Sequence, residues 1–178
     1  MGKIYYVMGK SASGKDTIYK RLVKKMPELG TVRMYTTRPI RDGETNGVEY
    51  IFTDEKQLQA MKDAGKVIEC RTYDTIYGPW SYFTADDGQI DLGSCSYLMM
   101  GTLESYEGLC KYYGAEVMVP LYIHVEDGVR LQRALNRENT QKNPKYAEMC
   151  RRFLADEKDF SKERLDQCGI RKQYENTG

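Results

Sequence analysis

The sequence has little of the chemistry that builds metal centres, disulfide frameworks or membrane spans. It contains one histidine, His124, and no C-x-x-C pair, so neither a zinc site nor a disulfide framework is expected. No apolar run approaches the roughly 20 residues that cross a bilayer, and the apolar residues 4–8 are too few for the core of a signal peptide. Reduced thiols of a cytoplasmic protein are therefore expected at Cys70, Cys95, Cys110, Cys150 and Cys168.

An excess of charge of one sign is missing as well. The 27 Lys and Arg residues offset 26 Asp and Glu residues, which leaves a net charge of +1. Neither nucleic acid nor a membrane surface is therefore expected as a partner, and any anion site must be built locally. The length of 178 residues suits a single folded domain with a sizeable core. No internal repeat or proline-rich linker divides the chain.

Short apolar runs alternate with segments of helical periodicity. Strands are expected at residues 3–8, 96–100 and 118–125, and a further short strand is expected to begin at residues 67–68. Helices are expected from about residue 15 and at 54–64, 103–113, 127–136 and 146–160. Thr53 is the expected N-cap of the second helix, and the tail after Lys162 is expected to fray in part. This alternation predicts an α/β domain with a largely parallel sheet.

The strongest motif is G-K-S-A-S-G-K at residues 9–15, which fits the phosphate-loop pattern G-x-x-x-x-G-K between a strand and a helix. Glycines let the backbone turn its N–H groups toward phosphate oxygens, and the helix dipole and Lys15 add positive charge. The alternative is a glycine-rich turn with a surface lysine. The residues expected to bind ATP are Gly9, Ser11, Ala12, Ser13, Gly14, Lys15, Asp16 and Thr17.

Asp16 stands where this motif usually carries the serine or threonine that binds magnesium. A carboxylate can contact hydrated Mg²⁺ directly or through water, so Asp16 is the candidate metal ligand. It is equally well placed as an acid in the first turn of a helix, where it interacts favourably with the helix dipole. Both interpretations stay open.

A second candidate anion site follows at residues 35–44, where Arg38 and Arg41 flank Pro39 behind two threonines. Two arginines three residues apart are suited to clamp one phosphate, because guanidinium groups bind phosphate oxygens bidentately. The alternative is a solvated loop with surface arginines.

The run T-T-R-P-I-R-D-G-E-T-N-G-V-E-Y at residues 36–50, together with the phosphate loop, resembles the guanylate kinase family. The resemblance implies a parallel sheet of the P-loop NTPase type, flanked by helices, within one domain spanning residues 1–178. It implies a core of 1–31, 84–130 and 152–178, a monophosphate-binding subdomain at 32–83 and a helical lid at 131–151.

The resemblance also assigns roles to residues that would hold the acceptor. It implies that Arg38, Arg41, Tyr50 and Tyr77 hold the acceptor phosphate. It implies that Glu69 accepts hydrogen bonds from guanine, whose N1–H and exocyclic amine suit a carboxylate.

Three arginines follow at helical spacing. Arg130, Arg133 and Arg137 stand at positions i, i+3 and i+7, so they are expected to share one helix face. The resemblance matches Arg133 and Arg137 to lid arginines, and Arg151 or Arg152 to the last one. Such arginines neutralise charge on the transferring phosphoryl group. The alternative is a solvated basic face.

Several departures from the family pattern fall on base recognition. Met34 replaces a serine that many members use against guanine, and Pro79 stands where a phosphate-binding hydroxyl is expected, although Ser81 is near. The family's acidic strand aligns with residues 98–101, which contain no carboxylate. A site that leaves base edges unpaired discriminates poorly.

The sequence therefore predicts a kinase that transfers the γ-phosphoryl group of ATP to GMP, giving GDP and ADP, with Mg²⁺ as cofactor. The expected catalytic residues are Lys15, Arg38, Arg133, Arg137 and Arg152. The alternatives are a kinase for another nucleoside monophosphate or a sugar phosphate, and a binding module without activity. Both a monomer and a homodimer remain open.

Overall fold

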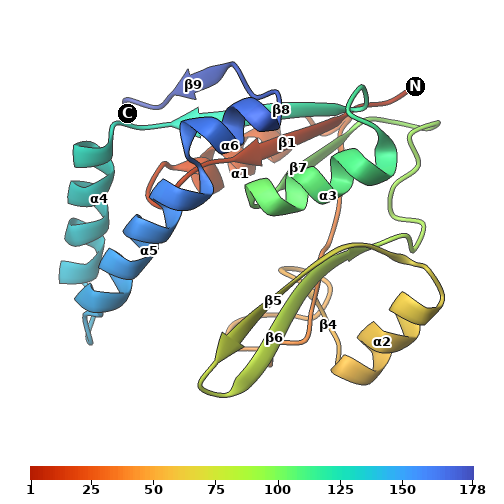
Figure 1. The fold of residues 1–178 in the computed structure, drawn as a ribbon, viewed down its shortest axis with the longest axis horizontal. Helices are drawn as coiled ribbons and strands as arrows, with labels where there is room; N and C mark the ends of the chain where they lie inside the picture. The colour runs from red at the N-terminus through yellow and green to blue at the C-terminus, as the bar shows by residue number, and fades with distance from the viewer. The chain divides into compact units, whose positions relative to one another are not determined.

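The structure is a computed structural model that describes residues 1–178 (Figure 1). Its contacts divide the chain into two compact units. The first comprises residues 1–4, 28–98 and 104–118, and the second comprises residues 5–27, 99–103 and 119–178.

The main sheet has five strands in the order β2-β7-β1-β8-β9. These are β1 (Ile4–Met8), β2 (Gly30–Thr31), β7 (Tyr97–Met100), β8 (Met118–His124) and β9 (Gln173–Glu175). β2 pairs in parallel with β7, and β8 pairs in parallel with β9. β1 is a run of apolar and aromatic residues that is almost wholly buried, as expected of a parallel strand covered on both faces. The predicted α/β class is confirmed.

The second unit holds four helices: α1 (Lys15–Lys25), α4 (Asp127–Asn139), α5 (Tyr146–Asp159) and α6 (Lys162–Gln167). α1 begins where the motif predicts it, and its apolar residues Ile18, Leu22 and Val23 are half-buried. α4 and α5 run side by side (Figure 1), joined by a short segment that contains Pro144. No helix in residues 1–178 combines the length and apolar character needed to cross a bilayer.

The first unit contains a mixed sheet with the order β4-β3-β6-β5. Its strands are β3 (Tyr35–Thr36), β4 (Ile51–Phe52), β5 (Val67–Thr75) and β6 (Gly78–Ala85). The unit also carries α2 (Glu55–Asp63) and most of α3 (Leu103–Tyr113). Leu58 of α2 packs on Phe83 and Ala85 of β6. The strand expected only as a short segment from Val67 is in fact one arm of a long antiparallel hairpin.

The expected cap of α2 was wrong by one residue. Asp54 is the N-cap, since its backbone is extended and its carboxylate accepts a 2.8 Å hydrogen bond from the Gln57 N–H. The Thr53 hydroxyl donates instead to the Gln57 side chain at 3.0 Å. A carboxylate near the helix N-terminus also gains from the helix dipole, which favours the arrangement found.

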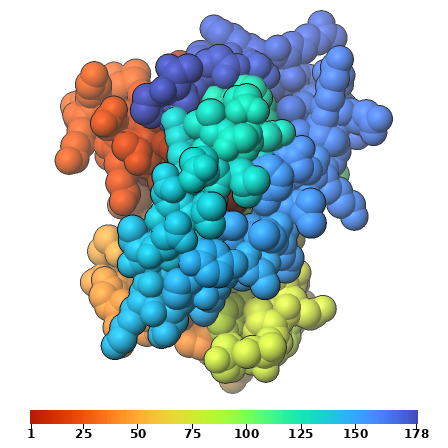
Figure 2. Space-filling model, turned by 90° about the vertical axis from the view of Figure 1, so that its left-hand side faces the viewer, coloured from red at the N-terminus to blue at the C-terminus, as the bar shows by residue number.

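The expected fraying of the tail was also wrong. Ser161 caps α6, Ile170 is buried, and β9 follows as an edge strand beside β8. Asn176 then donates its N–H to the carbonyl of His124 at 2.9 Å. In Figure 2 the dark-blue end of the chain accordingly lies against the start of teal α4.

Candidate functional site

The loop at residues 9–14 joins β1 to α1 with a backbone suited to an anion. Ala12 and Gly14 have positive φ values of 61° and 80°, which turn the chain back on itself. A Cβ at Gly9 would lie 2.7 Å from the Ile123 carbonyl, so only glycine fits there. α1 starts without a side-chain cap, which leaves the N–H groups of its first turn open to an anion.

One side chain in this loop is left without a partner. Ser13 is 1% exposed, and its hydroxyl forms no hydrogen bond in the structure. A buried polar atom without a partner carries a free-energy cost, which a phosphate oxygen bound in the loop would relieve. The ammonium group of Lys15 lies 3.7 Å from the carboxylate of exposed Asp16. The predicted phosphate loop therefore contains an unpartnered donor and a cation.

Residues 1–178 contain no group of three or more His, Cys, Asp or Glu side chains that would hold a metal ion alone. Mg²⁺ in nucleotide sites is usually bound by one or two carboxylates together with phosphates and waters. The exposed carboxylate of Asp16 and the hydroxyl of Thr17 fit that kind of site, in which the nucleotide supplies the other ligands.

Arg130 is buried, so it is not part of the solvated basic face that was the alternative interpretation of the three arginines. It is 1% exposed, and it donates to the Ser11 carbonyl at 3.0 Å. It also binds the carboxylates of Asp127 at 2.9 Å and Glu157 at 3.0 Å, with Phe153 stacked 4.6 Å away. A buried guanidinium must be paired, so Arg130 is a structural residue beneath the loop.

Two further pairs complete this cluster around Ser11, and sequence reasoning missed them. The Ser11 N–H donates to Asp156 at 2.8 Å, and Lys10 binds Glu157 at 2.6 Å. The Ser11 N–H, expected to face the phosphates, is therefore already paired with a carboxylate. The only available signal was the pair of adjacent acids on α5, at positions that periodicity places near the helix's packed face.

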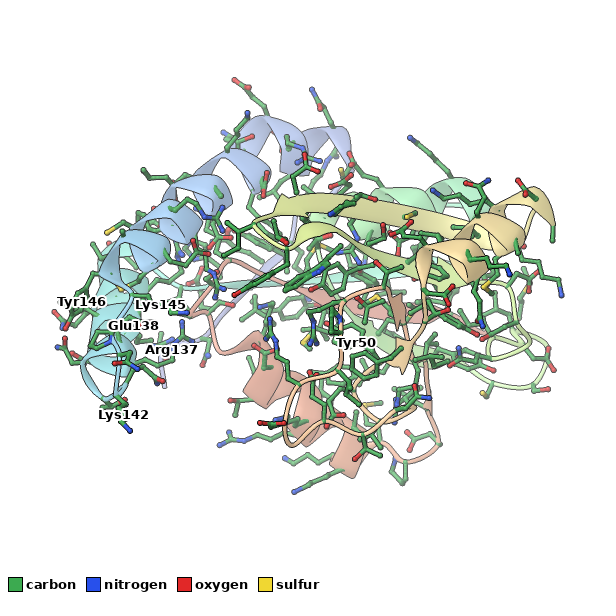
Figure 3. The ribbon with its side chains drawn as sticks, turned by 90° about the horizontal axis from the view of Figure 1, so that it is seen from below. Tyr50, Arg137, Glu138, Lys142, Lys145 and Tyr146 are labelled. Carbon is green, nitrogen blue, oxygen red and sulfur yellow. The ribbon has the colours of Figure 1, made fainter.

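Arg137 of α4 and Arg152 of α5 line one pocket with Ser11, and the pocket has a volume of about 100 Å³. Its full lining is Ser11, Arg130, Ala134, Arg137, Glu138, Lys145, Glu148, Met149, Arg152 and Phe153. Figure 3 shows Arg137, Glu138 and Lys145 together at the end of the α4–α5 pair. The structure thus brings two expected catalytic arginines to the phosphate loop.

The other two candidate arginines of these helices do not line this pocket. Arg133 donates to the carbonyls of Asn176 at 3.3 Å and Gly178 at 3.5 Å, at the end of the chain. Arg151 binds Glu148 at 2.7 Å. Of the pair Arg151 and Arg152, only Arg152 lines the pocket.

In the first unit, Arg38 is 4% exposed and makes a bidentate pair with Glu44 at 2.8 and 3.0 Å. Hydrogen bonds from Arg38 and from the Arg41 N–H lower the pKa of Glu44 to about 2. The Arg38 guanidinium also lies over the Tyr50 ring at 5.6 Å. Burial raises the pKa of Tyr50, so its phenol stays protonated and can donate to a phosphate.

The structure places Arg38 and Tyr50 together and leaves Arg41 exposed beside them. Tyr77 lies at the tip of the β5–β6 hairpin, where it is 77% exposed and stacks on Trp80 at 6.0 Å.

Glu69 is buried in β5, where its carboxylate accepts hydrogen bonds from Thr84 at 2.8 Å and from Arg71 at 3.3 Å. Arg71 is also buried, and its Nη2 lies 3.8 Å from the sulfur of Met34. Sequence reasoning missed Arg71. Its position two residues after Glu69 on one strand was the available signal, because such residues share a face.

Comparisons with known proteins agree with this arrangement. A family model described as "Guanylate kinase" matches residues 1–81. Over 78 residues the chain is 37% identical to a guanylate kinase of Legionella pneumophila (strain Lens), which covers 43% of this chain and 37% of that protein. A guanylate kinase of Coxiella burnetii is 37% identical over 76 residues, or 42% of this chain and 37% of that protein. The matched segment thus spans little more than a third of these relatives.

A crystal structure of guanylate kinase from Anaplasma phagocytophilum has the same fold across the chain. The TM-score is 0.63 at 14% sequence identity, and the match covers 99% of this chain and 78% of that one. The family model thus matches the first 81 residues, and the fold of this guanylate kinase extends over nearly the whole chain.

Proposed function

We propose that the protein is a nucleoside monophosphate kinase that transfers the γ-phosphoryl group of ATP to GMP, giving GDP and ADP. The observation that carries this proposal is the pocket in which Arg137 and Arg152 meet Ser11 of the phosphate loop. Two arginines beside a phosphate loop place positive charge where a transferring phosphoryl group develops charge on its oxygens.

The donor triphosphate binds residues 9–17 in this proposal. Backbone N–H groups at the start of α1 and the unpartnered Ser13 hydroxyl donate to phosphate oxygens, and Lys15 adds a point charge. Asp16 and Thr17 would hold Mg²⁺, which would supply positive charge to neutralise the phosphoryl group. Arg137 and Arg152 close on that group, and Arg133 joins them on release from its contacts at the end of the chain.

The acceptor binds the first unit. Arg38, Arg41, Tyr50 and Tyr77 hold the phosphate of GMP, and Glu69 accepts hydrogen bonds from the base. Arg38 is preset by its bidentate pair with Glu44, which fixes the plane of the guanidinium. Transfer then needs no covalent intermediate, because orientation and electrostatic stabilisation suffice for in-line displacement. Residues 32–83 act as the acceptor subdomain and 131–151 as the lid on a core of 1–31, 84–130 and 152–178.

A coupled assay of ADP release tests the proposal, with ATP and Mg²⁺ against a panel of nucleoside monophosphates and sugar phosphates. We expect GMP to give the highest kcat/KM and Lys15→Met to abolish the rate. A GMP rate no higher than that of the other acceptors would contradict the choice of GMP. If ATP with Mg²⁺ failed to raise the melting temperature, a binding module without activity would be favoured instead.

A second acceptor class is favoured by three observations at positions expected to bind the acceptor's base or phosphate. Met34 offers a thioether in place of a hydroxyl, Pro79 has no side-chain donor, and β7 (Tyr97–Met100) is a buried strand without a carboxylate. The same panel decides between GMP and another phosphorylated small molecule.

A further inference from the structure

The two ends of the phosphate loop differ in whether their donors are already paired. Near α1, the Ser13 hydroxyl has no partner, and the first turn of the helix has no side-chain cap. At the other end, the Ser11 N–H donates to the Asp156 carboxylate at 2.8 Å. The neighbouring Lys10 ammonium binds Glu157 at 2.6 Å. The helix end of the loop is therefore open to an anion, and the end that follows β1 already holds carboxylates.

The Asp156 carboxylate has the properties of a competitor for a phosphate group. It is an anionic acceptor, as a phosphate oxygen is, and backbone N–H groups bind charged acceptors more strongly than neutral ones. Its side chain is 16% exposed, so the contact with Ser11 is largely shielded from water. The same carboxylate oxygen lies 3.7 Å from the Arg130 Nη1. An Asp156 side chain that leaves Ser11 therefore has a second partner beside it.

We propose that Asp156 is a specificity-determining residue of the donor site, and that its carboxylate competes with the γ-phosphate of ATP for the Ser11 N–H. The inference rests on the proposed function, in which the transferring phosphoryl group lies beside Ser11, Arg137 and Arg152. The γ-phosphate binds there once Asp156 has turned from Ser11 to Arg130. The α- and β-phosphates bind at the open helix end of the loop and do not compete with Asp156.

This competition weakens the binding of a triphosphate more than that of a diphosphate. A ligand that needs a minor conformation binds with an apparent affinity reduced by the fraction of molecules in that conformation. One hydrogen bond to a charged group is strong enough to shift such an equilibrium by about 10- to 100-fold. An aspartate that instead held the loop in its binding conformation would strengthen ATP binding. The two roles therefore predict that removal of Asp156 changes the affinity for ATP in opposite directions.

Calorimetric titration of ATP and of ADP, each with Mg²⁺, into the wild-type protein, Asp156→Ala and Asp156→Asn tests this assignment. We expect Asp156→Ala to bind ATP at least about 10-fold more tightly than the wild type and to leave ADP binding nearly unchanged. Asparagine keeps an acceptor oxygen and loses the charge, so Asp156→Asn should show an intermediate gain for ATP. The matched control is Asp159→Asn, which removes the same charge from a side chain of α5 that is 59% exposed and should match the wild type.

Thermal unfolding without nucleotide shows whether each variant folds, and Arg130 keeps Asp127 and Glu157 as partners in both Asp156 variants. Should Asp156→Ala not fold, Asp156→Asn decides alone. ATP binding that is unchanged or weaker in the folded variants, or a gain of equal size for ATP and ADP, overturns the inference. An absence of ATP binding in every protein overturns it too, and also contradicts the donor site of the proposed function. Because titration needs no turnover, variants that gain affinity for ATP in a protein that transfers no phosphoryl group contradict only the proposed function.

Discussion

At the scale of single residues, two adjacent arginines on α5 allow a matched comparison. Arg151 and Arg152 are similarly exposed, at 64% and 61% of their side chains, and both bind Glu148. Only Arg152 lines the pocket that contains Ser11. The two residues therefore share surroundings and charge, and differ in whether they face the proposed phosphoryl group.

Arg152→Ala should lower kcat by about 10²–10³-fold, because one electrostatic contact to the transition state is lost. Arg151→Ala should keep nearly the wild-type rate and is the matched control. Steady-state kinetics with saturating ATP and GMP measure both. Equal losses in the two variants would show that the helix, and not the pocket contact, determines the rate.

The ionisation of Glu44 is expected to make the stability of the fold depend on pH. Its pKa of about 2 in the folded protein lies below the ordinary value of 4.5 because Arg38 donates to it. Since the folded-state pKa is depressed, its contribution to stability is full above about pH 4.5 and is lost as the pH falls toward 2.

Urea unfolding of the wild type and Glu44→Gln should therefore differ at neutral pH and converge between pH 4.5 and 2. The Glu28→Gln variant, at an exposed position, is the control. A difference that stays constant down to pH 3 would mean that the Arg38–Glu44 pair does not stabilise the fold.

At the scale of elements, helix ends decide where α2 sits beside its sheet. The Asp54 carboxylate holds the Gln57 N–H, and Gly65 follows the helix with a positive φ of 68°. These two features bracket the segment whose Leu58 packs on β6. The cap therefore fixes the register of the buried face.

Asp54→Ala should lower the free energy of unfolding by about 1 kcal/mol, since an N-cap side chain is lost. Thr53→Ala, one residue earlier, should change it by no more than a few tenths of that amount, because the Thr53 hydroxyl bonds only an exposed side chain. Chemical unfolding of the two variants compares them directly. A larger loss of unfolding free energy for Thr53→Ala would mean that Thr53, and not Asp54, is the N-cap.

At the scale of the whole molecule, ligands for the two proposed sites should leave separate footprints. ATP with Mg²⁺ should slow amide exchange at residues 9–17 and in α4 and α5. GMP should slow it at residues 36–50 and in the β5–β6 hairpin. Hydrogen exchange with each ligand alone measures both patterns, because binding raises the free energy of local opening. GMP protection confined to residues 9–17 would contradict the assignment of two sites.

The parts of this molecule that sequence patterns predicted are those specified by neighbours in the chain. β1, the phosphate loop and α1 form one contiguous motif, and the helix predicted at residues 103–113 coincides with α3. The missed features join distant residues: β9 beside β8, Arg71 against Met34, and Asp156 on Ser11. Such pairings depend on tertiary packing, which periodicity within one segment does not encode.

The cluster around Ser11 limits which amino-acid substitutions can be tolerated at its positions. Lys10 and Arg130 meet three carboxylates there, those of Asp127, Asp156 and Glu157. The side chains of Arg130 and Lys10 are only 1% and 12% exposed, so the loss of a carboxylate leaves a poorly hydrated cation with fewer counter-charges, and effects within such a network are not additive. Homologues that lack one of these five residues should therefore lack a second one of opposite charge, so that the charged residues of the cluster are replaced in compensating pairs.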